Sequence, residues 1–457
     1  MTIDPISARV VDRVNGGGNR GTAGPTAREI AATIGQMVTA GDLAPGDRLP
    51  TVRALADRLG VSSSTVSDAW RILAHHGTIN TARRNGTTVR ASRVSLAGRH
   101  WQVPVPPGSL AIDLSAGTPD AELLPSLGSV LRGLHSDMIV TSYIDSPLLG
   151  SLEAELVARW PFEPERLTVV DGAMDALDRL VSLLIGLGDT VVVEDPTFPP
   201  LLDMLELAGA TVVGVELDSQ GPIPQQFAAA MDTEPVAVIL QPRAHNPTGV
   251  SLSSERTLAL SEVLERSGSK PWIIEDDHSA GACEAPVVSL GLKWPSQVIH
   301  IRSFSKSHGP DLRIAAIGGA GDPIAAVVQR RQLGAAWTSR VLQHLLLNML
   351  VDAGTEALVA RAAAEYGRRR RIMAEVLAEN GTIVGQGTGL NMWLPVNDEN
   401  RACVALAVAG IGVAPGRPFR VTEPERGGHI RLSLGEARGS TPELTALAEK
   451  IAIAAKA

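Results

Sequence analysis

The chain has 457 residues, more than one hydrophobic core can hold, and a formal net charge of −8 at pH 7, so we expect several domains. No apolar run is long enough to span a bilayer, and residues 1–28 contain no apolar signal segment, which predicts a cytoplasmic protein without a membrane partner. The two cysteines, Cys283 and Cys403, lack metal-ligand spacing, so we expect reduced thiols and no metal site.

The charge is divided unevenly along the chain. Residues 1–92 contain 11 arginines, no lysine and 7 acidic residues, a net charge of +4, whereas the remaining residues carry a net charge of −12. A basic N-terminal module on an acidic body indicates a polyanionic partner for that module.

The N-terminal module has the pattern of a flexible arm followed by short helices. Residues 1–24 contain Gly, Asn and Arg with little periodicity, which predicts the arm, and residues 25–39 place their apolar side chains on one helix face. A short helix over 52–59 follows, with Thr51 as its N-cap and Gly60 at its end. Ser62 or Ser63 caps the next helix, which we expect to end near residue 76. Two short helices joined by a turn that contains glycine form a helix-turn-helix.

The second helix of this motif would enter the major groove of double-stranded DNA. The candidate contacts are an arginine of the preceding helix and the residues that open the second helix: Arg53, Ser62, Ser63, Ser64 and Thr65. Two predicted strands, 78–81 and 87–90, flank a hairpin tip with Arg83 and Arg84, which predicts a wing for phosphate or minor-groove contact. The alternative for any single piece is a small helical bundle with a solvated hairpin.

In this order the pieces resemble the winged-helix domain of the GntR family, notably over residues 46–56, Gly-Asp-Arg-Leu-Pro-Thr-Val-Arg-Ala-Leu-Ala. Where that family often has an arginine this chain has Ser63, so the base specificity of the family does not transfer. Residues 93–111 are rich in Pro, Gly and Ser, which predicts a semi-stiff linker. We therefore expect a DNA-binding domain over 25–92 and, beyond the linker, a second domain over 112–457.

The second domain contains motifs at the ends of predicted strands, where open α/β sheets bind ligands. A glycine turn that opens a helix, Gly172-Ala173-Met174, suits a phosphate. Phe198 can stack on an aromatic ring, and Asn246, in an Asn-Pro-Thr-Gly loop, can donate to a phenolate. Asp276, after an apolar strand, can keep a ring nitrogen protonated. Each feature alone is more typical of an ordinary turn, a core phenylalanine or a solvated strand end.

A fifth motif, Ser303-Phe304-Ser305-Lys306 followed by Arg313, places a lysine among hydroxyl groups with an arginine nearby. A lysine that loses its proton forms Schiff bases with carbonyl cofactors, and hydroxyls with an arginine bind a dianionic phosphate. Together these features point to pyridoxal 5′-phosphate (PLP). The alternative is a surface lysine and arginine on a serine-rich loop, which the four other motifs disfavour.

The five motifs, in this order, resemble the fold-type I aminotransferases from about residue 112 to the C-terminus. The resemblance implies an α/β fold with a large mixed or parallel sheet, helices on both faces and a small α+β subdomain. It implies that Lys306 forms the Schiff base and that Arg431, in residues 428–434, binds the α-carboxylate of a substrate or effector. The other implied cofactor contacts are Gly172, Ala173, Met174, Phe198, Asn246, Asp276, His278, Ser303, Ser305 and Arg313.

The chain departs from that family at one position of the site. Where the family usually has a tyrosine that donates to the phenolic oxygen of the cofactor, this chain has His278. An imidazole can make the same hydrogen bond, but it titrates near neutrality. We therefore hypothesise that His278 replaces the tyrosine and makes the spectrum of bound PLP sensitive to pH.

A GntR-like domain fused to an aminotransferase-like domain resembles the MocR subfamily of bacterial regulators, over nearly the whole chain. The resemblance implies a homodimer, associated with the nucleoid when bound to promoter DNA, in which PLP, alone or with an amino acid or amine, controls DNA binding. Two alternatives remain: a working aminotransferase with an accessory winged helix, and a sensor for which PLP itself is the signal. The uncharged Pro199 and Pro200 after Phe198 favour an effector without a second carboxylate, or PLP itself as the effector.

Overall fold

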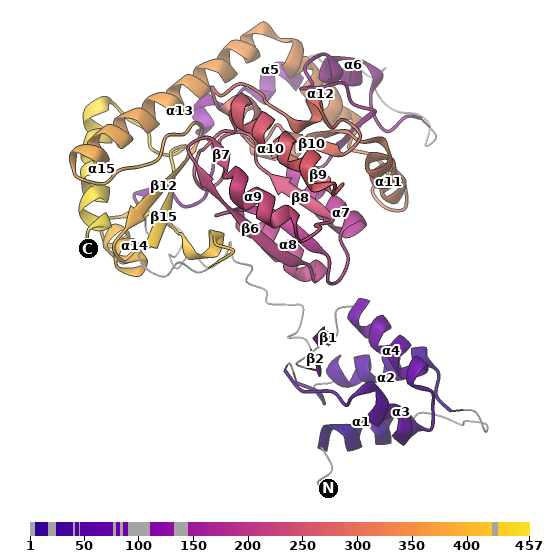
Figure 1. Cartoon of the computed structure of the whole chain (residues 1–457). Coiled ribbons are helices and arrows are strands. Elements are labelled where there is room, and N and C mark those ends of the chain that lie inside the picture. Colours follow the sequence, from indigo (N-terminus) through magenta and orange to yellow (C-terminus); the bar gives the residue numbers. More distant parts are fainter. Residues whose placement is uncertain are drawn as a thin grey trace. The chain divides into compact units, whose positions relative to one another are not determined.

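The structure is a computed structural model, which describes residues 5–16, 24–39, 42–44, 46–75, 79–82, 86–89, 110–131, 145–422 and 428–457. The chain divides into two compact units, with the division between Gly98 and Arg99 (Figure 1). Each unit has a hydrophobic core of its own. Within the described ranges, no helix combines the length and the apolar character needed to cross a membrane.

The N-terminal unit combines helices with a β-hairpin. Its described elements are α1 (Pro5–Gly16), α2 (Ala27–Thr39), α3 (Val52–Leu59), α4 (Ser63–His75), β1 (Ile79–Ala82) and β2 (Gly86–Val89). At the start of α3 the hydroxyl of Thr51 accepts a hydrogen bond from the backbone N–H of Ala54, and Gly60 ends the helix with a φ of +64°. The strands β1 and β2 pair antiparallel, with Ile79 opposite Val89. The structure thus confirms the helix-turn-helix and the two strands of the wing.

The first helix corrects the prediction of a flexible arm over residues 1–24. Residues 5–16 form α1, and Val10 and Val14 are fully buried in the core of the N-terminal unit together with Ile30 and Ile34 of α2. Side chains four residues apart lie on one face of a helix, so the two valines form an apolar stripe. The stripe is too short to predict a helix from the sequence alone, and the helix is stabilised by the packing of these valines on α2.

The C-terminal unit is built on a mixed sheet of eight strands in the order β4-β11-β10-β9-β8-β5-β6-β7. The strands are β4 (Arg166–Val170), β5 (Thr190–Asp195), β6 (Thr211–Asp218), β7 (Gly221–Pro222), β8 (Ala237–Leu240), β9 (Trp272–Asp277), β10 (Val298–Ser303) and β11 (Ala315–Gly319). β11 is antiparallel to both neighbours and β7 is antiparallel to β6, whereas the other neighbours are parallel. β5, β8 and β9 are buried along almost their whole length, so both faces of the sheet are covered.

Helices provide that cover: α9 packs on β6, and α7 packs on β4, β10 and β11. The helices of this part are α5 (Leu127–Leu131), α6 (Gly150–Ala158), α7 (Ala173–Leu184), α8 (Pro199–Ala208), α9 (Pro224–Met231), α10 (Ser254–Ser267), α11 (Gly321–Gln332), α12 (Arg340–Val351) and α13 (Ala353–Glu379). Figure 1 shows α9 and α10 in front of the strands. Because β5, β8, β9 and β10 run parallel, the residues that follow them meet at one edge of the sheet.

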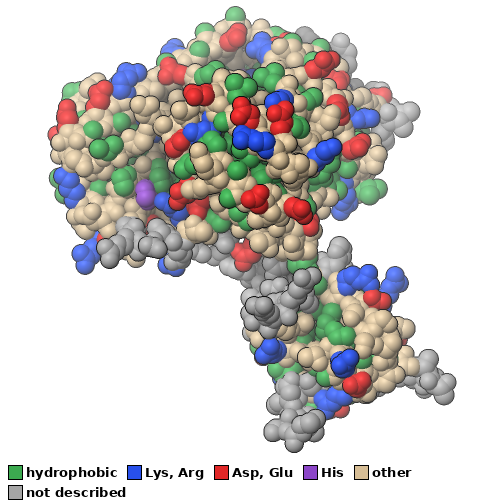
Figure 2. Space-filling view, in the orientation of Figure 1, with side chains coloured by type: hydrophobic (Ala, Val, Ile, Leu, Met, Phe, Trp, Pro, Cys, Tyr) green, Lys and Arg blue, Asp and Glu red, His purple; other side chains and the backbone are tan. Residues whose placement is uncertain are grey.

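A smaller α+β subdomain completes the C-terminal unit, with a core separate from that of the large sheet. It contains the three-stranded sheet β12-β15-β14 and a parallel pair in which β13 joins β3. Its elements are β3 (Ile112–Asp113), β12 (Asn391–Val396), α14 (Glu399–Val408), β13 (Ile411–Gly412), β14 (Ala414–Pro415), β15 (Gly428–Ser433) and α15 (Thr441–Ala455). On the visible face of the C-terminal unit, acidic and basic side chains are interspersed (Figure 2). The predicted fold class is confirmed in both units.

Candidate functional site

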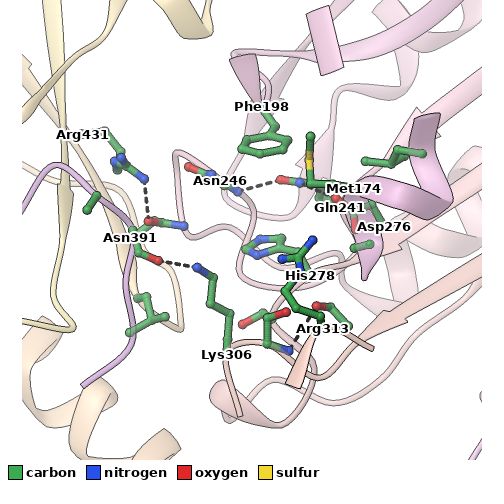
Figure 3. A pocket seen from close by; sticks show the side chains of 18 residues that line it. Met174, Phe198, Gln241, Asn246, Asp276, His278, Lys306, Arg313, Asn391 and Arg431 are labelled. Atoms are coloured by element: carbon green, nitrogen blue, oxygen red, sulfur yellow. Dashed lines mark hydrogen bonds between the residues drawn. The ribbon is translucent and has the colours of Figure 1, made fainter. Parts of the chain in front are cut away.

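A cavity of about 210 Å³ brings together residues from all five motifs (Figure 3). It lies at the carboxyl edge of the large sheet, and residues of the small subdomain form one wall. The predicted residues that line it are Ala173, Met174, Phe198, Asn246, Asp276, His278, Ser303, Ser305, Lys306, Arg313 and Arg431. The other lining residues are Ala116, Gly117, Leu177, Gln241, Ser279, Leu390 and Asn391. The cavity therefore gathers the candidate residues of both subdomains at one place.

Lys306 follows β10 and points across the cavity toward the small subdomain (Figure 3). Its Nζ donates a hydrogen bond to the backbone carbonyl of Gly117. Burial, and to a lesser degree the guanidinium of Arg431, lowers the pKa of Lys306 to about 8. The uncharged amine is the form that attacks an aldehyde, and a pKa near 8 makes that form much more abundant at neutral pH.

Asp276 lies near the end of β9, with its side chain in the cavity. The side-chain amide of Gln241 donates a hydrogen bond to Oδ2 of Asp276 at 2.9 Å, whereas Oδ1 is buried and has no partner among the described residues. Burial raises the pKa of this carboxyl group to about 6. A buried carboxylate oxygen that lacks a donor fits the protonated ring nitrogen of PLP, which would supply one.

The start of α7 and the residues after β10 form a wall that fits a phosphate. Gly172 precedes the first turn of α7 with a φ of +105°, and the free backbone N–H groups of that turn favour an anion. A Cβ atom on Gly172 would lie 3.1 Å from Nη2 of Arg313, so glycine allows the guanidinium to approach the start of the helix. Ser303 and Ser305 line the same cavity. A helix N-terminus, a guanidinium and two hydroxyl groups are suited to a dianionic phosphate.

Figure 3 shows the rings of Phe198 and His278 on opposite sides of the cavity. Nε2 of His278 lies 3.1 Å from the carbonyl oxygen of Ala244, and because a carbonyl oxygen only accepts, Nε2 carries the proton. Burial, followed by the charge of Lys306, lowers the pKa of His278 to about 4. The imidazole is therefore neutral with an unprotonated Nδ1. The expectation that it titrates near neutrality is wrong, because burial favours the uncharged form.

Arg431 lies on β15 and lines the cavity from the side of the small subdomain. Its Nη2 donates a hydrogen bond to the carbonyl of Ser115, and its Nη1 lies 3.4 Å from Oδ1 of Asn391. The guanidinium also lies over the ring of Phe419, 5.4 Å from its centroid. Burial lowers the pKa of Arg431 to about 10, still high enough to keep the charge at neutral pH. A buried guanidinium of this kind is suited to a carboxylate ligand.

Among the lining residues that were not predicted, Gln241, Gly117 and Asn391 contact predicted residues of the site. The amide of Gln241 donates to Asp276, and its Oε1 accepts from the backbone N–H of Asn246 at 2.8 Å, so one side chain positions both residues. The position of Gln241 directly after a buried strand was a usable signal, because Asp276 lies near the end of a neighbouring strand at the same edge of the sheet. Gly117 and Asn391 carried no such signal, since they reach the cavity only through the packing of the small subdomain.

The candidate DNA contacts lie at the start of α4. The hydroxyl of Ser62 accepts a hydrogen bond from the backbone N–H of Thr65 at 3.1 Å and lies 2.7 Å from the hydroxyls of Ser64 and Thr65, which makes it the cap of the helix. The exposed candidates are Arg53, Ser62, Ser63 and Ser64, and Thr65 is half-buried. Exposed hydroxyl and guanidinium groups at a helix start are suited to phosphate and base contacts. Arg83 and Arg84 lie outside the described residues.

Both units of the chain match known families. Residues 111–451 match the family Aminotransferase class I and II, and residues 26–89 match the bacterial regulatory proteins of the gntR family. The chain is 36% identical over 418 residues to the vitamin B6 salvage pathway transcriptional repressor PtsJ of Salmonella typhimurium, covering 90% of this chain and 95% of that protein. It is 26% identical over 419 residues to the probable rhizopine catabolism regulatory protein MocR of Rhizobium meliloti, covering 84% and 81%. The chain belongs to the MocR-type GntR regulators.

The MocR-type chain is thus a transcriptional regulator whose C-terminal unit has the fold of a PLP-dependent enzyme family. That unit resembles an archaeal alanine:glyoxylate aminotransferase with a TM-score of 0.67 at 25% identity, over 75% of this chain and 90% of that chain. It resembles an aspartate aminotransferase from Thermus thermophilus with a TM-score of 0.65 at 23% identity, over 76% and 92%. These enzymes share the fold of the regulator, and the matched GntR domain adds the DNA-binding function.

Proposed function

We propose that this MocR-type regulator binds PLP as a Schiff base with Lys306, and that PLP, alone or with an amino-compound effector, controls its binding to promoter DNA. The observation that carries the proposal is the pairing of Lys306, with a pKa lowered to about 8, with the unpartnered buried oxygen of Asp276 in one cavity. When bound, PLP supplies an aldehyde and an electron-withdrawing ring. The residues of the chain hold that group in place.

We assign the remaining residues of the cavity by their chemistry. Asp276 would accept from the ring nitrogen, and the amide of Asn246 would donate to the phenolic oxygen. Phe198 and the neutral His278 would cover the two faces of the ring, because they lie on opposite sides of the cavity. The phosphate would be held by the start of α7 with its flanking groups: Gly172, Ala173, Met174, Ser303, Ser305 and Arg313. Lys306 is then the one catalytic residue of the site, since it alone forms a covalent bond.

The charges of the cavity restrict the effector. The cations among its described lining residues are Lys306, Arg313 and Arg431, and the proposal uses all three. A second carboxylate on a ligand would therefore have no cation left among them. The signal is then PLP itself or an amino compound with at most one carboxylate, bound at Arg431. Two relatives favour vitamin B6 by their names: the B6 salvage repressor PtsJ and the pyridoxine biosynthesis regulator PdxR of Corynebacterium glutamicum, which is 27% identical over 366 residues.

We further propose that the regulator acts as a homodimer on promoter DNA in the bacterial cytoplasm. Two winged helices on one dimer can bind two half-sites of an operator, which explains why DNA-binding proteins of this type dimerise. The contacts to DNA would come from the start of α4, the arginine of α3 and the wing: Arg53, Ser62, Ser63, Ser64, Thr65, Arg83 and Arg84.

The test is a DNA-binding assay with the purified chain and its own upstream DNA, with and without PLP. We expect PLP to change the affinity in the wild type and to have no effect in Lys306→Ala. Arg431→Ala distinguishes PLP from an amino acid as the signal. If PLP alone is the signal, the DNA affinity of this variant still changes when PLP is added. If an amino acid is the effector, the DNA affinity of this variant no longer changes when that amino acid is added. The proposal fails if the DNA affinity of the wild type is the same with and without saturating PLP and also stays the same when an amino acid or amine is added together with PLP.

A further inference from the structure

A short segment between the linker and the cavity contacts both cations of the effector end of the site. Residues 110–118, called here the 110–118 segment, comprise the last two residues of the predicted linker and the seven residues after it. The carbonyl of Ser115 accepts a hydrogen bond from Arg431, and the carbonyl of Gly117, two residues later, accepts one from Lys306. One short piece of backbone therefore satisfies the side chains that would bind the ligand.

The first half of the segment is fixed to the small subdomain. β3 pairs with β13, the N–H of Leu114 donates to the carbonyl of Gly412 at 2.8 Å, and the carbonyl of Leu114 accepts from the N–H of Ser433 at 2.8 Å. Leu114 is fully buried in the core of that subdomain. Movement of the second half would therefore act on β3, which begins at Ile112, directly after the predicted linker.

The second half is fitted closely around Arg431. Gly117 has a φ of +68°, and a Cβ atom there would lie 3.1 Å from Nη1 of Arg431. Oδ1 of Asp113 accepts hydrogen bonds from the N–H and the hydroxyl of Ser115, at 2.8 and 2.6 Å, which holds the turn between the two halves. This turn connects β3 to Ala116 and Gly117, which line the cavity.

Ligand binding removes the hydrogen bonds that hold this segment. When Nζ of Lys306 condenses with the aldehyde of PLP, a C=N bond forms and the aldehyde oxygen leaves as water with two hydrogens from the amine. The nitrogen would then have at most one N–H in place of those of the free amine, so its hydrogen bond to the carbonyl of Gly117 would be weakened or lost. A carboxylate at Arg431 competes with the carbonyl of Ser115 in the same way. Ser115 and Gly117 are half-buried, so the loss of these hydrogen bonds would leave their carbonyls held less firmly and would favour a movement of the segment.

We propose that the 110–118 segment relays the chemical state of Lys306 and Arg431 to the linker and thereby to the winged helix. The inference rests on the proposed function, since it presumes that PLP controls DNA binding. It adds the route: bond formation at Lys306 releases Gly117, and β3 carries the change to the linker. The coupling is reciprocal, so operator DNA also changes the affinity for PLP by the same factor.

The test uses the full-length chain with its operator DNA and the variant Ile112→Gly, which loosens β3 outside the cavity. Ile383→Gly is the matched control, because Ile383 is an isoleucine of the C-terminal unit that lies in a loop and is 80% exposed. We expect PLP to change the DNA affinity of the wild type and of the control by about 5- to 150-fold. Ile112→Gly should still show the Schiff-base absorbance of PLP, but its DNA affinity should change by less than about twofold. A full wild-type response in Ile112→Gly would overturn the relay.

Hydrogen exchange of the wild type provides a second measurement that needs no variant of β3. Adding PLP should speed the exchange of the amides from Ser115 to Thr118, and Lys306→Ala should exchange them fast both with and without PLP. Unchanged exchange in the wild type, while absorbance reports the bond to Lys306, contradicts the relay. If exchange responds but DNA affinity does not, the proposed function fails and the release of the segment stands.

Discussion

The lowered pKa of Lys306 predicts how fast the chain captures PLP at each pH. With a pKa of about 8, roughly one amine in ten is uncharged at pH 7, whereas an ordinary lysine with a pKa of 10.5 has roughly one in three thousand. The structure therefore predicts a gain of about 300-fold in the reactive form at pH 7. Burial is the larger cause, and the charge of Arg431 is the smaller one.

The assay follows the initial rate at which the Schiff-base absorbance appears after pyridoxal is added, between pH 6 and 9.5. Pyridoxal lacks the phosphate, so no phosphate group titrates in this range. We expect the wild-type rate to rise with pH and to level off above a midpoint near 8. Arg431→Gln should move the midpoint upward, but by less than the full difference from 10.5, because burial remains.

Arg420→Gln is the control, since Arg420 is a partly buried arginine that does not line the cavity and is not among the causes of the shift. Its rate profile should coincide with that of the wild type. A wild-type rate that still rises tenfold per pH unit at pH 9.5 would refute the argument from burial. An unchanged midpoint in Arg431→Gln would refute the contribution of that guanidinium.

Three further predictions concern the phosphate wall, the histidine and the first helix. Gly172→Ala should weaken PLP binding by roughly 10- to 150-fold in an absorbance titration, because a Cβ atom there would displace the Arg313 guanidinium and cost about 1.5–3 kcal/mol of hydrogen bonding to the phosphate. Gly188→Ala is the control: Gly188 has a φ of +86° and open space around it, so its backbone strain should lower stability but leave the PLP affinity unchanged. The visible absorbance of the PLP-bound protein should change with pH in the same way in the wild type and in His278→Phe between pH 5.5 and 8.5, since an imidazole with a pKa of about 4 does not change its charge there. Different titration curves for the two proteins would show that the imidazole titrates in this range. Val10→Ala should lower the free energy of unfolding of the winged helix by roughly 1–3 kcal/mol in a urea titration, because Val10 is fully buried. Arg13→Ala, on the exposed side of α1, should change that free energy by less than about 0.5 kcal/mol. Equal effects of the two substitutions would contradict the packing of α1 and support a flexible arm over residues 5–16.

The DNA-binding motif and the order of the cofactor motifs could be predicted from the sequence because their signals are local. Thr51 caps a helix through an N–H three residues away, and Gly60 ends it through its own backbone conformation. The motif around Lys306 likewise keeps its hydroxyls and its arginine within a few residues of the lysine. Such features depend only on residues that are close in the sequence, so they can be recognised before the tertiary structure is known.

The sequence also determined that the chain contains a lysine, an aspartate and a histidine at the positions predicted for a PLP site, but it did not determine the protonation state of those groups. The pKa values of Lys306, Asp276 and His278 all depend on burial, which is produced by the packing of the whole C-terminal unit. The tautomer of His278 follows from a carbonyl 34 residues away. The imidazole lines the cavity, as the sequence predicts, but its expected titration near neutrality is wrong because burial lowers its pKa to about 4.

The sequence by itself determined the two modules and the chemistry of their residues. Only the tertiary structure decided that Lys306 donates a hydrogen bond to the carbonyl of Gly117, 189 residues earlier in the chain. It also decided that Arg431 donates to the carbonyl of Ser115 in the same 110–118 segment, 316 residues earlier. No local signal marks Ser115 or Gly117, because their role depends on where β3 and β15 lie in the small subdomain. Contacts over such separations are set by strand order and by the burial of side chains, which exist only in the folded chain.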